Sequence, residues 1–181
     1  MSDEKEIRPI DLASLQHKED LLKVEDIMME ECHAKDMIGF RMTNCPATQM
    51  SVTPQAYLYE GQYNPSKEEL DKMEKILRKK YATARGLSMF TNETKAEKHA
   101  KRLVKKLLKD VGEEEAQAFM EKNAYLVKFD IPASTGVSTE PHKTTKHYNF
   151  FPKENIDVLD LMDASYGYKK IDYDYDYDKN E

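Results

Sequence analysis

The stretch "GLSMFTNETKAEKHAKRLVKKLLKD", residues 86–110, joins a short apolar run to a polar turn and then to a strongly basic segment. Residues 86–90 have the length and composition of a short strand. Thr91 or Asn92 can cap a following helix, and Gly112 can end it. The apolar residues of that helix recur at helical spacing, at Ala96, Ala100, Leu103, Val104, Leu107, Leu108 and Val111. The stretch therefore predicts a strand followed by an amphipathic helix that packs on a sheet.

Patterns on both sides of this junction predict further helices and strands. A helix is expected over about residues 18–33, and a second begins at Ser66, which forms a capping box with Glu69. A short helix is expected to start at residues 113–115, where three glutamates complement the helix dipole. Alternating apolar residues predict strands in "DMIGFRMT", "YLVKFDIP" and "KHYNFF".

These elements predict an α+β fold, a single domain with a small central β-sheet flanked by three or four helices. We expect this domain to span residues 16–168, after a polar leader of residues 1–15 and before an acidic Tyr/Asp tail of residues 169–181. The first residues contain no apolar segment that would direct secretion, and the chain has only two cysteines. Both features favour a cytoplasmic protein, with no membrane as partner.

The charge of the chain is unevenly distributed. Its net charge is −6, but residues 95–109 carry seven Lys and Arg residues against one Glu. A nucleic acid can be bound through Lys98, Arg102, Lys105 and Lys106. This interpretation is not favoured, because the apolar stripe is complete and no aromatic residue lies between the lysines. A solvated face of a packed helix explains the same pattern, while the acidic tail can dock a protein partner.

Several common catalytic and metal-binding patterns are absent from the sequence. Cys32, His33 and Cys45 lack metal-ligand spacing, so no metal is predicted. The chain has neither a glycine-rich phosphate loop nor the G-x-S-x-G turn that a nucleophilic serine in a Ser–His–Asp triad uses.

Three polar residues on predicted strands form a more informative pattern. Arg41 alternates with apolar residues, Ser88 lies just before the polar turn, and His147 lies on a later strand with Glu154 beyond it. A guanidinium binds phosphate or carboxylate through paired hydrogen bonds, and a hydroxyl can bond a ribose or a neighbouring ligand-holding group. This pattern suits a cleft for an anionic ligand that carries a ribose.

The order of "GFRMT", "GLSMFTNETKAEKHA", "YLVKFDIP" and "HYNFF" resembles the ADP-ribosyltransferase-like fold, particularly its small toxin-type or phage-type members. The resemblance covers about residues 36–160. It implies a protein that binds NAD and modifies a macromolecular target. Arg41 and Ser88 would contact the cofactor, while His147 or Glu154 would take the third, catalytic position. Tyr57, close to Tyr59 and Tyr63, would form an aromatic wall against the nicotinamide.

The sequence departs from the family pattern at two points and leaves a second function open. Leu87-Ser88-Met89 stands where other members have Ser-Thr-Ser, and the Glu-x-Glu pair of arginine-modifying transferases is missing. The alternative is a non-enzymatic interaction or accessory protein, from a phage or mobile element, that docks a partner through its basic helix or acidic tail.

Overall fold

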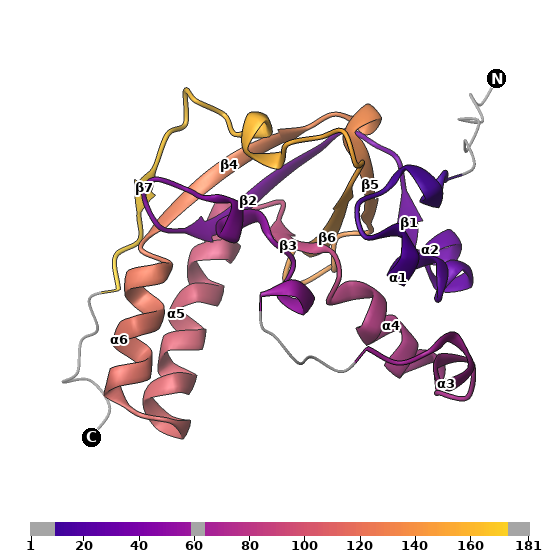
Figure 1. Cartoon of the computed structure of the whole chain (residues 1–181). Coiled ribbons are helices and arrows are strands. Elements are labelled where there is room, and N and C mark those ends of the chain that lie inside the picture. The colour runs from indigo at the N-terminus through magenta and orange to yellow at the C-terminus, as the bar shows by residue number, and fades with distance from the viewer. Residues whose placement is uncertain (1–9, 59–63, 174–181) are drawn as a thin grey trace.

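The computed structural model describes residues 10–58 and 64–173 of the chain (Figure 1). Within these residues it contains one seven-stranded antiparallel sheet with strand order β1-β5-β6-β3-β2-β4-β7. The strands are β1 (Cys32–His33), β2 (Met37–Thr43), β3 (Leu87–Phe90), β4 (Tyr125–Ile131), β5 (Gly136–Thr139), β6 (His147–Pro152) and β7 (Lys169–Lys170). The predicted α+β fold with a central sheet is confirmed.

Six α-helices and five 3-10 helices accompany the sheet in the described part of the chain. The α-helices are α1 (Lys18–Leu22), α2 (Glu25–Glu31), α3 (Lys67–Asp71), α4 (Lys75–Thr83), α5 (Glu93–Asp110) and α6 (Glu113–Lys122). The 3-10 helices are η1 (Leu12–Ser14), η2 (Gln49–Val52), η3 (Gln55–Tyr57), η4 (Ala133–Thr135) and η5 (Val158–Leu161).

The two faces of the sheet are covered in different ways. On one face, Phe90 and Leu126 pack against α5, and Phe151 and Val137 pack against α1, α2 and α4. The helices on this face thus form two groups, α5 with α6 and α1 to α4, which stand apart in Figure 1. On the other face, residues of the central strands, such as Phe129, pack against η2 and η5.

The strand and helix at residues 86–110 form as predicted. Asn92 caps α5 by accepting a hydrogen bond from the Lys95 backbone N–H at 3.0 Å. Ala96, Ala100 and Val104 are buried against the sheet. The small size of these residues lets the helix lie close to the strands, so β3 and α5 hold a fixed relative position.

The first two predicted helices are each broken. The segment expected as one helix over residues 18–33 forms α1 and α2, interrupted at Val24 and followed by β1. The helix capped by Ser66 and Glu69 has the predicted capping box, but it ends at Asp71, and α4 starts at Lys75. The break changes which face is buried. Consequently Ile76 and Leu77, which continue the helical spacing of Leu70 and Met73, are 55% and 46% exposed.

The structured domain extends beyond the predicted residues 16–168 at both ends. Leu12 and Leu15, placed in the polar leader, are buried in the core. At the other end, Lys169 and Lys170 form β7 along β4, and Ile171 is buried against α5. Both segments contain apolar residues at positions that reach the core, and this burial outweighs their polar composition.

Gly86 provides a test of the packing beneath β3. A Cβ at this position would lie 2.8 Å from Phe151 Cζ and 2.9 Å from Asn149 Cβ. We expect Gly86→Ala to lower the free energy of unfolding by about 1–3 kcal/mol, because the buried neighbours have little room to move. Urea denaturation measures this change. Ser88→Ala is the control, since it adds no atoms to the same strand; an equal loss in both variants would contradict the packing explanation.

Candidate functional site

The sheet is almost divided between β2 and β3. These strands are paired at one position, Phe40 with Phe90, whereas β2 and β4 pair over seven residues. Arg41 follows Phe40 directly, and its guanidinium fills the widening space. Arg41 Nε donates to the Ser51 carbonyl and Nη1 donates to the Ser88 carbonyl, both at 2.6 Å. The side chain thus bonds one backbone carbonyl of β3 and one of the 3-10 helix η2, and so links this helix to the sheet.

Ser88 and His147 lie on the neighbouring strands β3 and β6, on the face that carries the helices. The Ser88 hydroxyl oxygen and His147 Nε2 are 2.6 Å apart, which makes a hydrogen bond. The register pairs Ser88 with Asn149 and Phe90 with His147, so the serine and histidine are diagonal neighbours. Ser88 is exposed and His147 is half-buried, packed with its ring edge-on to Phe90.

At pH 7 the Arg41 guanidinium is charged, whereas the nearby His147 imidazole is neutral. Burial, followed by the nearby His99, His142 and Arg41, lowers the pKa of His147 below 6.5, so its imidazole is neutral at pH 7. Burial also lowers the pKa of Arg41 to about 10, which leaves the guanidinium charged. Among the described residues, Arg41 has neutral carbonyl partners and forms no ion pair with a carboxylate. Its side chain lies on the face of the sheet that η2 and η5 cover, opposite to the Ser88 hydroxyl and His147, and it reaches this pair through the Ser88 backbone carbonyl.

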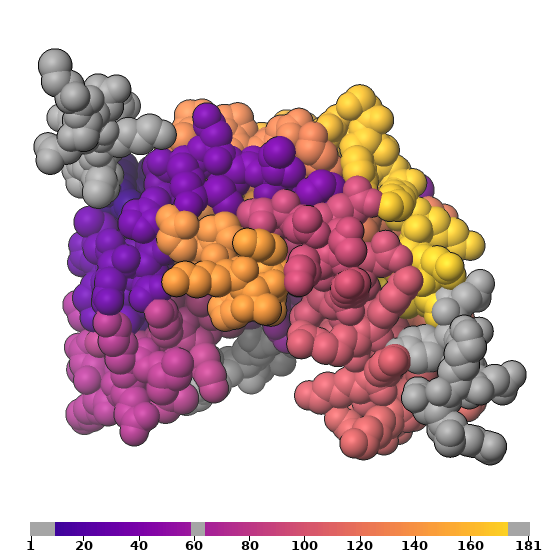
Figure 2. Space-filling model, turned by 180° about the vertical axis from the view of Figure 1, so that it is seen from behind, coloured from indigo at the N-terminus to yellow at the C-terminus, as the bar shows by residue number. Residues whose placement is uncertain are grey.

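Arg41, Ser88 and His147, which sequence analysis selects from three separate segments, therefore lie together. Two hydrogen bonds link them in series, from Arg41 to the Ser88 backbone and from the Ser88 side chain to His147. We call these three residues the RSH cluster. Figure 2 shows the loop that precedes His147 between the lobe of α3 and α4 and the lobe of α5 and α6.

The other predicted site residues lie elsewhere. Glu154 forms an ion pair with Lys18 at 3.0 Å and lines a polar pocket of about 300 Å³ with Gln16, Gln49 and Asp157. Tyr57 belongs to η3 and donates a hydrogen bond to Asp20. Its ring also stacks on His17, with ring centroids 3.8 Å apart. Its partners Tyr59 and Tyr63 fall outside the described residues.

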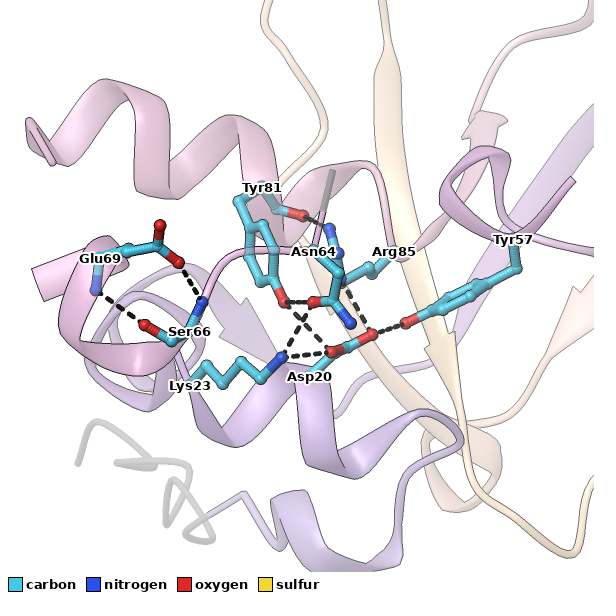
Figure 3. Close-up of polar contacts among 8 residues, drawn as sticks. All are labelled: Asp20, Lys23, Tyr57, Asn64, Ser66, Glu69, Tyr81 and Arg85. Carbon is cyan, nitrogen blue, oxygen red and sulfur yellow. Dashed lines mark hydrogen bonds and ion pairs between the residues drawn. The ribbon is translucent and has the colours of Figure 1, made fainter. Parts of the chain in front are cut away.

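Tyr57 is part of a buried polar network that sequence reasoning missed (Figure 3). Asp20 on α1 accepts hydrogen bonds from Tyr57 at 2.8 Å and from Lys23 at 3.0 Å. Arg85, only 6% exposed, has its Nε 3.3 Å from Asp20 Oδ2 and its guanidinium carbon 3.4 Å above the centre of the Tyr81 ring. The angle at Nε does not make a hydrogen bond, so this contact is an ion pair. No local sequence pattern signals it, because its members are far apart along the chain.

The network stabilises the charged form of Asp20. Burial alone would raise the pKa of this carboxyl, but the hydrogen bonds from Tyr57 and Lys23, together with the charge of Arg85, lower it to about 2. The same environment raises the pKa of the Tyr81 hydroxyl to about 12. These interactions tie α1, η3 and α4 together, immediately before Gly86 and β3.

The basic side chains of α5 point away from the apolar core. Lys98, Arg102, Lys105 and Lys106 are exposed, whereas the small apolar residues on the opposite side are buried. This geometry agrees with a solvated face of a packed helix. The acidic tail lies outside the described residues from residue 174 onward, so its docking of a protein partner stays a prediction.

Residues 10–58 and 64–173 contain neither a metal-binding group nor a membrane-spanning helix. No group of three or more His, Cys, Asp and Glu side chains there is arranged to hold a metal ion. None of the helices in the same residues has the length and apolar character needed to cross a bilayer.

Comparison with known proteins yields no relative. No protein-family model matches the chain, and neither the curated proteins nor the solved structures contain a match.

The buried network predicts how stability depends on pH. Asp20 has a lower pKa in the folded chain, about 2, than its ordinary 3.8, so its contribution is complete above pH 4 and is lost as the pH falls toward 2. We expect Asp20→Asn to cost about 2–4 kcal/mol at pH 7, because it leaves Arg85 buried without its counter-ion. The difference from the unsubstituted chain should shrink by about 2 kcal/mol on acidification.

Chemical denaturation between pH 2 and pH 7 measures this dependence. Asp26→Asn is the matched control, because Asp26 pairs with Arg78 on the exposed surface and its side chain is 60% accessible. We expect that variant to lose less than about 1 kcal/mol. A pH-independent difference for Asp20→Asn would show that the carboxylate charge is not what stabilises the network.

Proposed function

We propose that this chain is an ADP-ribosyltransferase-like protein that binds NAD at the RSH cluster and modifies a macromolecular target. The observation that carries the proposal is the convergence of Arg41, Ser88 and His147 from three separate segments of sequence. The strands that bear them, β2, β3 and β6, are consecutive in the sheet. They occur along the chain in the order that the family resemblance implies.

Each residue of the cluster has a chemical role that fits this cofactor. The charged Arg41, which has no carboxylate partner among the described residues, offers a counter-ion for a phosphate of NAD. Ser88 holds His147 Nε2 at hydrogen-bond distance and so fixes the orientation of the imidazole. A neutral imidazole can hydrogen-bond a ribose hydroxyl or accept the proton of an acceptor group.

The transfer itself is a substitution at the ribose carbon that bears the nicotinamide. A nucleophilic atom of the target forms a bond to this carbon as the bond to the nicotinamide nitrogen breaks. Nicotinamide leaves as a neutral molecule, and the acceptor loses its proton to a base. His147 is the base nearest to Ser88, and its lowered pKa keeps it unprotonated at neutral pH.

The missing glutamate of better-known members has a physical consequence. A carboxylate would add a negative charge next to the positive charge that develops on the ribose, whereas a neutral imidazole supplies a dipole only. We expect the proposed activity to be lost in acid, since protonation of His147 would place a second cation beside Arg41.

A non-enzymatic interaction protein is the second candidate function. It is favoured by exposed apolar side chains on two adjacent helices, Met29 on α2 at 44% exposure and Ile76 on α4 at 55%. Three ion pairs bind these two helices together, Asp26 to Arg78, Glu30 to Lys75 and Glu31 to Lys79. Such a surface can receive a protein partner.

Substitution of Arg41 separates the two candidates. With NAD labelled in its adenylate portion and a cell extract, we expect the unsubstituted protein to transfer label and Arg41→Ala to lose at least about tenfold of that activity. This loss corresponds to about 1.4 kcal/mol, the lower end of a charge-assisted hydrogen bond. Arg41→Lys should recover part of the activity, since lysine keeps the positive charge but lacks the paired N–H donors of the guanidinium.

Ser88→Ala and Ser134→Ala form a matched pair for the same assay, because both are exposed serines near the ends of sheet elements. We expect Ser88→Ala to reduce transfer and Ser134→Ala to leave it unchanged. NAD binding, measured by calorimetry on the same samples, reports the cofactor step directly. Absence of both NAD binding and label transfer in the unsubstituted protein would reject the transferase proposal and favour the interaction protein.

A further inference from the structure

The basic residues of α5 include a row that leads to the RSH cluster. Lys95, His99, Arg102 and Lys106 follow one another at spacings of four, three and four residues, so they lie along one side of the helix. The three cations of this row are exposed and His99 is half-buried. The acidic residues Glu93 and Glu97 lie on a different side, where Glu93 pairs with Lys169 and Glu97 with Lys101.

His99 connects this row to the cluster. Its Nδ1 is 3.0 Å from Arg102 Nη2, and its ring lies 5.1 Å from the ring of Phe90. His147 packs on the same Phe90 ring at 5.2 Å. The two histidines are close enough for a charge on His99 to lower the pKa of His147. The row therefore passes beside the Ser88–His147 hydrogen bond at His99.

A second group of basic residues lies on the loop that precedes His147. His142, Lys143 and Lys146 are exposed there. The Lys146 carbonyl accepts a hydrogen bond from the Thr91 backbone N–H at 2.9 Å, which fixes this loop to the residues just before α5. Figure 2 shows the loop, in bright orange, beside the start of α5. The site is thus bordered by cations on two sides, although the chain as a whole carries a charge of −6.

From this arrangement we infer that the macromolecular target is a nucleic acid, whose phosphates dock on Lys95, Arg102 and Lys106 and on the loop cations Lys143 and Lys146. We call these five residues the basic border. Their charge is complementary to a polyanion, and an acidic protein surface would not provide evenly spaced charges along a row. The inference deepens the proposed function, because it names the class of acceptor at the same site.

The dimensions of the row suit a nucleic-acid backbone. The eleven-residue separation of Lys95 and Lys106 corresponds to about 16 Å along a helix axis, the rise of about five nucleotides of one strand. A nucleotide of such a segment that binds beside His99 would lie next to Ser88 and His147. The buried side of α5 is unaffected, so the same helix packs through Ala100 and Val104 and binds through the opposite side.

Binding is tested with the full-length chain and fluorescein-labelled single-stranded RNA and DNA 20-mers, by anisotropy at several salt concentrations and without NAD. We expect binding that weakens steeply with salt. Arg102→Gln and Lys106→Gln should each weaken it about three- to tenfold at low salt, and each should reduce the magnitude of the salt slope by about 0.7–0.9. Lys101→Gln is the control, since Lys101 lies on the side of the ion pair with Glu97.

Three results would overturn the inference: absence of binding to both 20-mers at about 50 mM salt, equal weakening by Lys101→Gln and Arg102→Gln, or label transfer in extract onto material that resists nucleases and is removed by protease. NAD calorimetry on the same variants keeps the two proposals distinguishable. Absence of NAD binding in the unsubstituted protein would reject the transferase proposal but would not change the measured binding to nucleic acid. Normal NAD binding without nucleic-acid binding would reject only the acceptor class.

Discussion

The position of the Arg41 guanidinium determines how the central sheet and the candidate site fit together. A sheet joined by one residue pair between β2 and β3 would leave carbonyl groups of both strand ends without partners. Arg41 on β2 donates to the Ser88 carbonyl of β3 and to the Ser51 carbonyl of η2, so a charged side chain joins the two strands where their backbone pairing is short. The short pairing between β2 and β3 and the position of Arg41 both follow from this replacement of backbone hydrogen bonds by side-chain hydrogen bonds. Removing the cation would affect the shape and the charge of the site together.

Arg85 and Arg41 illustrate two different uses of an arginine in this fold. Arg85 is nearly inaccessible and faces Asp20, Tyr57 and Tyr81, so its charge is neutralised inside the protein. Arg41 bonds neutral carbonyls and forms no ion pair with a described carboxylate. A buried ion pair of the first kind holds helices in place at a high desolvation cost. An arginine such as Arg41, whose charge no described carboxylate neutralises, can still attract an anion, as a phosphate-binding site requires.

Local sequence patterns predicted most elements but not their boundaries. The β3–α5 junction was predictable because Asn92 caps a complete apolar stripe, and both signals agree. The breaks at Val24 and after Asp71 were missed, since helical periodicity continues across them. The short strands β1, β5 and β7 were missed too: two are only two residues long, and pairing with a neighbour defines them more than composition does.

The RSH cluster was predictable because strand alternation separates polar from apolar residues, and its three members stand out against apolar neighbours. The Asp20–Arg85 network was not, because ion pairs between distant residues leave no periodic signal. The same limit explains why α5 alone suggested a solvated face. Its basic side gains a functional meaning only through His99, Phe90 and His147, whose contacts join helix and strands. Charge near a reactive group, rather than charge alone, distinguishes a docking surface from a solubilising one, and that proximity is a property of the fold.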